Sequence, residues 1–331
     1  MRWLLVLVIA GCYQPAPQVG TPCSAPGNCP SPLRCDRGVC VTAAGGDDAA
    51  VDATGDAASD APGDSGPACN PPTLGAWSAP GVIGELAAPG LDGTPMMRAD
   101  GLELYWKSAR SGSLDIYRSM RPTTLQDWGP PMNVTELNSP ANDGSPELSP
   151  DGLTIYLSSE RPDTVGANDI YVATRTSLTT AWSTPARLAQ LSSTAQDEGM
   201  MVMPSDLVAY MHSHRSGAAR IYRMTRATKT APWSVPVEIA ELSDGAYENP
   251  MVTADECRMY MQAERMDSEG TADLYVSTRA QPSGPWGVPT KIKPPSTPLF
   301  DADPWISADE KYLMFTTGNG LSNLDLVEAT R

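Results

Sequence analysis

The sequence is poor in several residue types, and each shortage excludes a class of protein. Lys and Arg number 23 against 39 Asp and Glu, which gives a formal net charge of −16. A surface of that sign repels phosphate backbones, so the composition argues against nucleic acid as a partner. The only histidines are His212 and His214, and no Gly-rich phosphate loop, GxSxG elbow or supported Cys-His pair is present. The sequence therefore carries no familiar signature of nucleotide binding or of nucleophilic catalysis.

Long apolar runs are also missing. The run at 3–10 follows the basic residue Arg2 and is far too short to span a membrane as a helix. It ends in Ile9-Ala10-Gly11-Cys12, which resembles a bacterial lipobox. The resemblance implies a signal peptide at 1–11, cleavage before Cys12 and acylation of its thiol, after which 12–22 serve as a lipid-anchored tether. The alternative is an ordinary signal peptide with a Cys nearby. The residue after Cys12 is Tyr13. A signal that retains lipoproteins at the inner membrane would have Asp there, so we expect a cell-envelope location at the outer membrane.

Acylation of Cys12 would leave six cysteines, an even number in an exported, oxidising setting. Four of them lie within the segment 23–40, which is too small to bury a core, so we expect two disulfides to hold it. These are Cys23, Cys29, Cys35 and Cys40, and their pairing cannot be read from the sequence. A four-Cys zinc site is the alternative, but the segment lacks a CxxC pair.

The segment 41–68 consists mainly of Ala, Asp, Gly, Ser and Pro and has no Lys, Arg or aromatic residue. It offers too little apolar surface to offset the entropy of ordering, so we expect a disordered, extended linker.

The remainder, 69–331, repeats one pattern at a spacing of 50 to 54 residues. A period near 50 with several short strand-like runs per copy is typical of a β-propeller, with one blade per repeat. The markers are Trp77, Trp128, Trp182, Trp233 and Trp286, then Tyr105, Tyr156, Tyr210, Tyr260 and Met314, and then Arg121, Arg175, Arg226, Arg279 and Arg331. Every marker Trp is followed three residues later by Pro, which suits an edge strand.

Strand counting predicts an all-β, five-bladed propeller with four antiparallel strands per blade. We expect the innermost strands at 95–98, 146–149, 200–203, 250–253 and 304–307. The chain begins with a single outermost strand, led by Trp77, which has no inner strands before it. The last three strands of the chain form an inner set that has no outermost strand after it. The strand led by Trp77 can therefore complete the last blade. The same closure would bring Cys69 near Cys257, and we expect a disulfide between them.

The second repeat resembles the WD40-like repeat of TolB-type propellers. The resemblance rests on Pro146, Ser149-Pro150-Asp151-Gly152, Ile155-Tyr156, Ser159-Glu160-Arg161 and Asp169-Ile170-Tyr171. It covers roughly 77–331, although the other repeats depart from it, and neither the six blades nor the N-terminal α/β domain typical of TolB is found. The resemblance implies a propeller, usually a binding scaffold, and does not transfer the partners of TolB.

Carboxylates precede each innermost strand and should ring one mouth of the channel. They are Asp92, Asp143, Asp197, Glu198, Glu248, Asp301 and Asp303. Such a ring could bind Ca²⁺, a basic peptide or a sugar, whereas the structural alternative is that these residues cap turns by accepting backbone hydrogen bonds. A second set of acids opens the third strand of four blades (Asp115, Asp169, Asp273 and Asp325), and we expect it to pair with an arginine that follows the second strand of four blades (Arg110, Arg161, Arg215 and Arg265). The third blade breaks the pattern with Arg220 in place of the acid, and the fifth with Asn319 in place of the arginine.

Two side chains remain. On a strand, His212 and His214 share one face and could join a carboxylate in a metal site, although packing or exposure is the simpler role.

We expect no enzyme: the sequence favours a lipid-anchored, non-catalytic propeller that binds a protein or a cell-envelope glycan at the acidic mouth. The alternative is a carbohydrate-active hydrolase that uses the mouth carboxylates, as some five-bladed propellers do.

Overall fold

The computed structural model describes residues 33–36, 39–42, 68–70, 73–320 and 323–331, and side chains from 68 onward. The predicted signal peptide, Cys12, Cys23, Cys29 and most of the linker lie outside these residues. The chain divides into two units at Gly63/Asp64. In the first unit, β1 (Leu33–Asp36) pairs with β2 (Val39–Thr42), and Cys35 lies opposite Cys40. Within the described residues no helix is long and apolar enough to cross a membrane.

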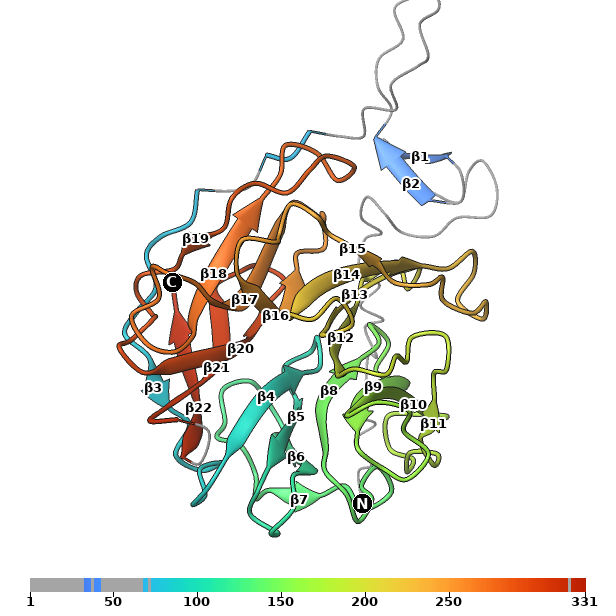
Figure 1. Cartoon of the computed structure of the whole chain (residues 1–331), viewed down its shortest axis with the longest axis vertical. Helices are drawn as coiled ribbons and strands as arrows, with labels where there is room; N and C mark the ends of the chain where they lie inside the picture. The colour runs from blue at the N-terminus through green and yellow to red at the C-terminus, as the bar shows by residue number, and fades with distance from the viewer. Residues whose placement is uncertain (1–32, 37–38, 43–67, 71–72, 321–322) are drawn as a thin grey trace, which may run out of the picture. The chain divides into compact units, whose positions relative to one another are not determined.

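The second unit is a propeller of five four-stranded antiparallel sheets (Figure 1). The blades consist of β4 (Asp92–Met97), β5 (Glu103–Ser108), β6 (Asp115–Met120) and β7 (Met132–Asn133); β8 (Asp143–Leu148), β9 (Thr154–Ser159), β10 (Asp169–Thr174) and β11 (Ala186–Arg187); β12 (Asp197–Val202), β13 (Val208–Ser213), β14 (Arg220–Thr225) and β15 (Val237–Glu238); β16 (Ala246–Val252), β17 (Arg258–Glu264), β18 (Asp273–Thr278) and β19 (Thr290–Lys291); and β20 (Phe300–Ile306), β21 (Tyr312–Gly318), β22 (Leu324–Thr330) and β3 (Gly81–Val82).

The ring closes as the sequence predicts. Strand β3 pairs with β22, and Val82 lies opposite Val327. A disulfide joins Cys69 to Cys257 with a Cα–Cα separation of 5.6 Å, so the start of the propeller is tied to its fourth blade. The outermost strands are shorter than expected: each begins directly after the repeated Pro, which has no N–H to donate to a ladder.

The innermost strands begin earlier than the sequence suggests, at the mouth acids themselves in three of the five blades and one or two residues before them in the other two. Each contains a β-bulge whose central residue has positive φ. These residues are Thr94, Ser145, Gly199, Asn249 and Asp303, with φ of 49°, 45°, 60°, 49° and 55°. A left-handed conformation is unfavourable for residues other than Gly, and for the β-branched Thr94 above all, so the surrounding sheet holds it in place. The bulge breaks the alternation and turns this residue toward the axis, where all five line one small cavity.

The repeated Arg and Trp form a stacked pair in every blade. The guanidinium carbon lies 4.0 to 4.3 Å from the centre of the Trp ring. The Arg Nε also donates to a carbonyl in the turn between the first two strands of its own blade, as Arg175 does to Gly152. These contacts hold the approach to the outermost strand against the inner turn of the same blade, which explains why the pattern repeats with the fold.

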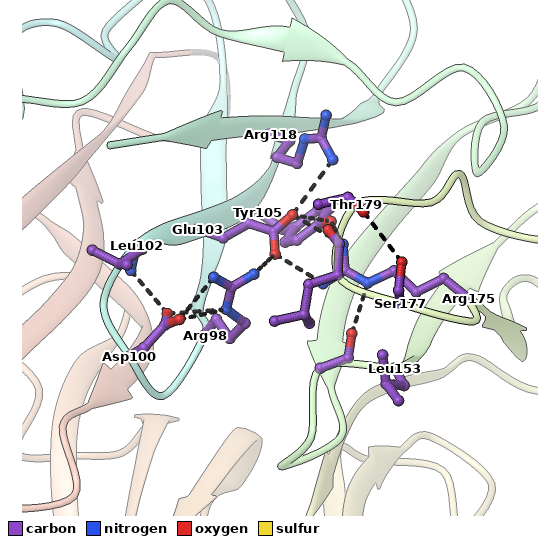
Figure 2. Close-up of polar contacts among 12 residues, drawn as sticks. Arg98, Asp100, Leu102, Glu103, Tyr105, Arg118, Leu153, Arg175, Ser177 and Thr179 are labelled. Carbon is purple, nitrogen blue, oxygen red and sulfur yellow. Dashed lines mark hydrogen bonds and ion pairs between the residues drawn. The ribbon is translucent and has the colours of Figure 1, made fainter. Parts of the chain in front are cut away.

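Between the first two blades this pair is joined by a buried acid (Figure 2). Glu103 accepts hydrogen bonds from both Arg175 and Tyr105, at 2.8 Å each, and a further ion pair from Arg98. Trp182 in turn donates to the Tyr105 hydroxyl at 3.1 Å. Burial alone would raise the pKa of Glu103, yet the hydrogen bonds from Arg175 and Tyr105 and the nearby guanidinium charges bring it below its usual value.

Candidate functional site

Four of the predicted mouth acids are structural. Each is at most 1% exposed and accepts a hydrogen bond from the backbone N–H four residues earlier, which is the turn-capping role left open by the sequence. The four are Asp92, Asp143, Asp197 and Asp301. The first three also form ion pairs with Arg110, Arg161 and Arg215 at 2.8, 2.6 and 2.5 Å.

These ion pairs correct the pairing expected between the arginines and the acids that open the third strands. Arg161, for example, follows the second strand by two residues and reaches sideways to Asp143 on the first strand, while its guanidinium lies 4.7 Å from the Tyr171 ring. The expected partner Asp169 instead accepts from the Val165 amide at 2.8 Å. Since the register places Asp143 opposite Ser159, the arginine has the shorter path to the innermost strand.

The fourth blade departs from this arrangement. Tyr247 occupies the place of the capping Asp and contacts Asp244 and Arg265. Glu248 therefore lies one residue later in the strand than the capping acids. Its structural counterpart in the third blade is Glu198, because the two residues pair with Gln262 and His212 at the same register position. The sequence had placed Glu248 with the capping acids and missed this shift.

Glu198, Glu248 and Asp303 form an acidic group at the mouth, which we call the mouth cluster. The Glu248 side chain is 29% exposed and that of Glu198 14%, so both are partly exposed, unlike the capping acids. Glu248 accepts from Gln262 at 2.7 Å, and Gln196 donates to Glu198 at 2.9 Å. Asp303 accepts from Asn249, and from the Thr94 amide and the Thr316 hydroxyl at 3.0 and 2.9 Å.

Both histidines face this cluster. His214 Nε2 lies 3.4 Å from Glu248, and His212 Nε2 lies 3.9 Å from Glu198. His212 is buried, its Nδ1 accepts from the Asn249 amide at 3.3 Å, and burial lowers its pKa to about 3, so it is neutral at ordinary pH. Within the described residues no three His, Cys, Asp or Glu side chains are arranged to hold a metal ion.

Glu198 and Glu248, two carboxyl groups of the cluster, have raised pKa values. Burial raises the pKa of Glu198, with Asp303 adding a smaller repulsion. Burial also raises the pKa of Glu248, and the Glu198 charge adds to it. Like charges held together favour the protonated form of at least one carboxyl group, which is the state required of a proton donor.

Small residues on the two neighbouring blades make room for a cation. A Cβ on Gly144 would lie 3.2 Å from Cδ of Lys107, and one on Gly93 would lie 3.2 Å from its Cε and 3.0 Å from the Asp303 carboxylate. Lys107 thus extends across the mouth toward the acids, and its charge lowers the pKa values of Glu198, Glu248 and His212 relative to burial alone. No repeat signal marks Lys107, because no other blade has a Lys at this position.

Below the cluster the channel narrows to a cavity of about 40 Å³, lined by Asp303, Asn249 and the neighbouring bulge residues. This cavity is therefore too small to admit a ligand much larger than water.

No family model and no curated protein matches the chain. Solved structures do resemble it. The catalytic domain of Coprinopsis cinerea GH62 alpha-L-arabinofuranosidase aligns with a TM-score of 0.55 and 10% identity over 77% of this chain and 96% of that one. A thermostable family-43 glycoside hydrolase aligns with a TM-score of 0.53 and 14% identity over 73% and 90%. TolB from Acinetobacter baumannii aligns with a TM-score of 0.48 and 17% identity over 74% of this chain and 55% of TolB, so the chain spans about half the length of TolB.

At such identities the similarity shows the fold, a five-bladed propeller. It also contradicts two expectations from the sequence, namely that the propeller is a non-catalytic binding module and that the chain is not an enzyme. Both drew on the resemblance to TolB-type repeats, whereas the GH62 and family-43 structures, which align with TM-scores above 0.5, are hydrolases.

Proposed function

We propose that the chain is a carbohydrate-active hydrolase whose active site is the mouth cluster. The observation that carries the proposal is the partly exposed pair of Glu198 and Glu248, whose pKa values are both raised, beside Asp303, which does not belong to the turn caps. Glycoside hydrolysis requires one protonated and one ionised carboxyl group on either side of the scissile bond. The glycoside hydrolases that share the fold are consistent with this reaction class.

Glu248 is assigned as the proton donor. Its side chain is the most exposed of the cluster, its raised pKa keeps it protonated above the usual range, and His214 lies 3.4 Å away. As the glycosidic C–O bond breaks, the leaving oxygen takes this proton. Asp303, held by Asn249, Thr94 and Thr316, is assigned as the carboxylate that receives a proton from the attacking water.

Lys107 and the neutral His212 complete the site. The ammonium group of Lys107 lies across from the acids and can hold a sugar hydroxyl or stabilise the carboxylate left after proton transfer. Glu198 raises the proton affinity of Glu248, so we assign it a positioning role and expect it to modulate the pH optimum.

We further propose that the enzyme is anchored to the bacterial cell envelope by lipid on Cys12, with the propeller acting beyond the linker. The support is the Ile9-Ala10-Gly11-Cys12 sequence and the disulfide between Cys69 and Cys257, which fits an oxidising compartment. Metabolic labelling with a palmitate analogue tests the anchor: the label should appear on the wild type and disappear in Cys12→Ser.

Hydrolysis of para-nitrophenyl glycosides, including the α-L-arabinofuranoside, tests the activity, with an alkyl glycoside of each active sugar in parallel. Glu248→Gln should lower turnover of the alkyl glycoside by about 10²-fold or more. The activated aryl glycoside should suffer less, since its leaving group needs little protonation. Asp303→Asn should lower both. Glu264→Gln, an exposed acid at the end of β17, is the matched control and should change neither. Activity that survives in both site variants, with melting temperatures unchanged, would refute the assignment.

A further inference from the structure

A second cavity lies at the opposite end of the innermost strands. Its volume is about 610 Å³, within the range of sites for small organic molecules. Most of its wall is apolar: Met96, Met201, Met251 and Trp305 occupy equivalent positions in four blades, and Met97 follows. Unbranched Met side chains adapt to ligands of irregular shape. The mouth cluster does not line this cavity.

The fifth equivalent position holds Glu147. This side chain lines both the large cavity and the narrow channel above it. Burial raises its pKa well above the usual value, and the only opposing contact is the Val202 amide. Burial therefore favours the protonated form of Glu147, a hydrogen-bond donor, at the narrow end of the cavity.

The repeated arginines show where an anion is missing. In the last three blades each pairs with an acid from its own turn: Arg226 with Asp206, Arg279 with Glu256 and Arg331 with Glu310. In the first two blades Gly101 and Gly152 occupy that turn position. Arg175 recovers a carboxylate from Glu103 of the preceding blade, as Figure 2 shows.

Arg121 alone among the five has no carboxylate partner within the described residues. It donates to the Gly101 carbonyl at 2.7 Å, approaches the Met97 sulfur at 3.9 Å and stacks on Trp128 at 4.2 Å. Glu103, which binds Arg175 of the next blade, is the first residue of the second strand in the first blade. The equivalent residue in the last blade, which precedes Arg121 in the ring, is Tyr312, and it donates its hydroxyl to Glu328. Met314 occupies the strand position that holds Tyr105 in the first blade, where the tyrosine hydroxyl contacts both Glu103 and Arg175. Arg121, Gly101 and Tyr312 all line the large cavity.

We propose that this cavity binds a small monocarboxylate with an apolar body, such as a medium-chain fatty acid. Its carboxylate takes the place of the missing acid and forms a bidentate ion pair with Arg121. Its apolar part lies against Met97, Met251 and Trp305. The rim acids Asp100 and Glu328 disfavour a second negative charge on the ligand, which selects a monocarboxylate.

Calorimetric titration of residues 12–331 with octanoate and with octanamide tests the proposal, because the two probes differ only in the charged group. Octanoate should bind, and octanamide should bind about tenfold or more weakly. Arg121→Gln should remove this difference. Arg223→Gln, an arginine of β14 that does not line the cavity, should preserve it. Equal affinity for the two probes in the wild type would overturn the role of Arg121, and no binding of either would overturn the site.

A second variant restores the acid within the chain. Gly101→Glu copies Glu256 and Glu310, which occupy the same turn position with φ of 55°. A Cβ at Gly101 would lie 3.0 Å from Cγ2 of Thr124, a side chain that must shift slightly, and 3.5 Å from a terminal nitrogen of Arg121, so the new carboxylate is within reach. The variant should fold, lose octanoate binding and keep the hydrolase activity at the other mouth. Retained octanoate binding in the folded variant would show that the ligand does not use Arg121.

Discussion

The buried acid between the first two blades allows a quantitative test of how the ring is held. The side chains of Glu103 and Arg175 are both fully buried, so Glu103→Gln would leave Arg175 without a counter-charge or water. Removing one partner of a buried ion pair costs about 3–5 kcal/mol. Arg98 loses less, because Asp100 still binds it at 2.7 Å. We therefore expect the free energy of unfolding to fall by about 3–5 kcal/mol.

The third blade supplies the control. Asp206→Asn removes the equivalent acid from Arg226, but these side chains are 12% and 9% exposed, so water can replace part of the interaction. Asn also tolerates the positive φ of 59° at this position. We expect a loss of about 1–2 kcal/mol. Urea unfolding followed by tryptophan fluorescence measures both variants. Equal losses, or a larger loss in Asp206→Asn, would refute the argument that complete burial of Arg175 sets the cost.

Two further predictions concern stability. Replacing Cys69 and Cys257 by Ser should lower the free energy of unfolding by up to about 5 kcal/mol, since the disulfide closes a loop with a sequence separation of 188; a loss below 1 kcal/mol would contradict the entropic argument. His212, whose pKa falls to about 3, stabilises the fold above its unfolded pKa near 6.5, and this contribution is lost as the pH falls toward 3. Compared with His212→Gln, the wild type should therefore lose about 3 kcal/mol more between pH 7 and 4.5, and parallel pH profiles would contradict this.

The features that could be predicted from the sequence are those that recur in every blade. The blade number, the closing strand and the Cys69–Cys257 disulfide follow from the Trp, Tyr and Arg spacing, because a repeated structure imposes a repeated pattern. The bulges were missed because a residue with positive φ leaves no clear signal when it is Thr, Ser or Asp. The acids that bind Arg110, Arg161 and Arg215 were predicted wrongly, because the distance from a guanidinium to each acid depends on how far the arginine side chain reaches across the strands of its blade.

The candidate site could be predicted only in part, for a related reason. Acids before each innermost strand look alike in sequence, yet burial separates the capping Asp143 from the partly exposed Glu248 by a single position in the strand. Tyr247 in place of the capping Asp produces that offset, and only the register against Gln262 reveals it. Lys107 reaches the site because Gly144 has no side chain in its path, and residue spacing in the sequence does not indicate such a contact.

Both proposed sites lie where the repeat is broken, and this has a physical basis. A ring of equivalent blades satisfies its own polar groups, so an unsatisfied or repelled charge arises only where one blade differs from the rest. At one mouth Glu198 and Glu248 replace Gly and Ala, and their raised pKa values reflect the cost of holding like charges in a buried setting. At the other, Arg121 keeps the repeated cation while its acid is gone. Charges that the fold does not neutralise are available to a substrate or ligand, which is why these departures, and not the conserved geometry of the blades, locate the chemistry.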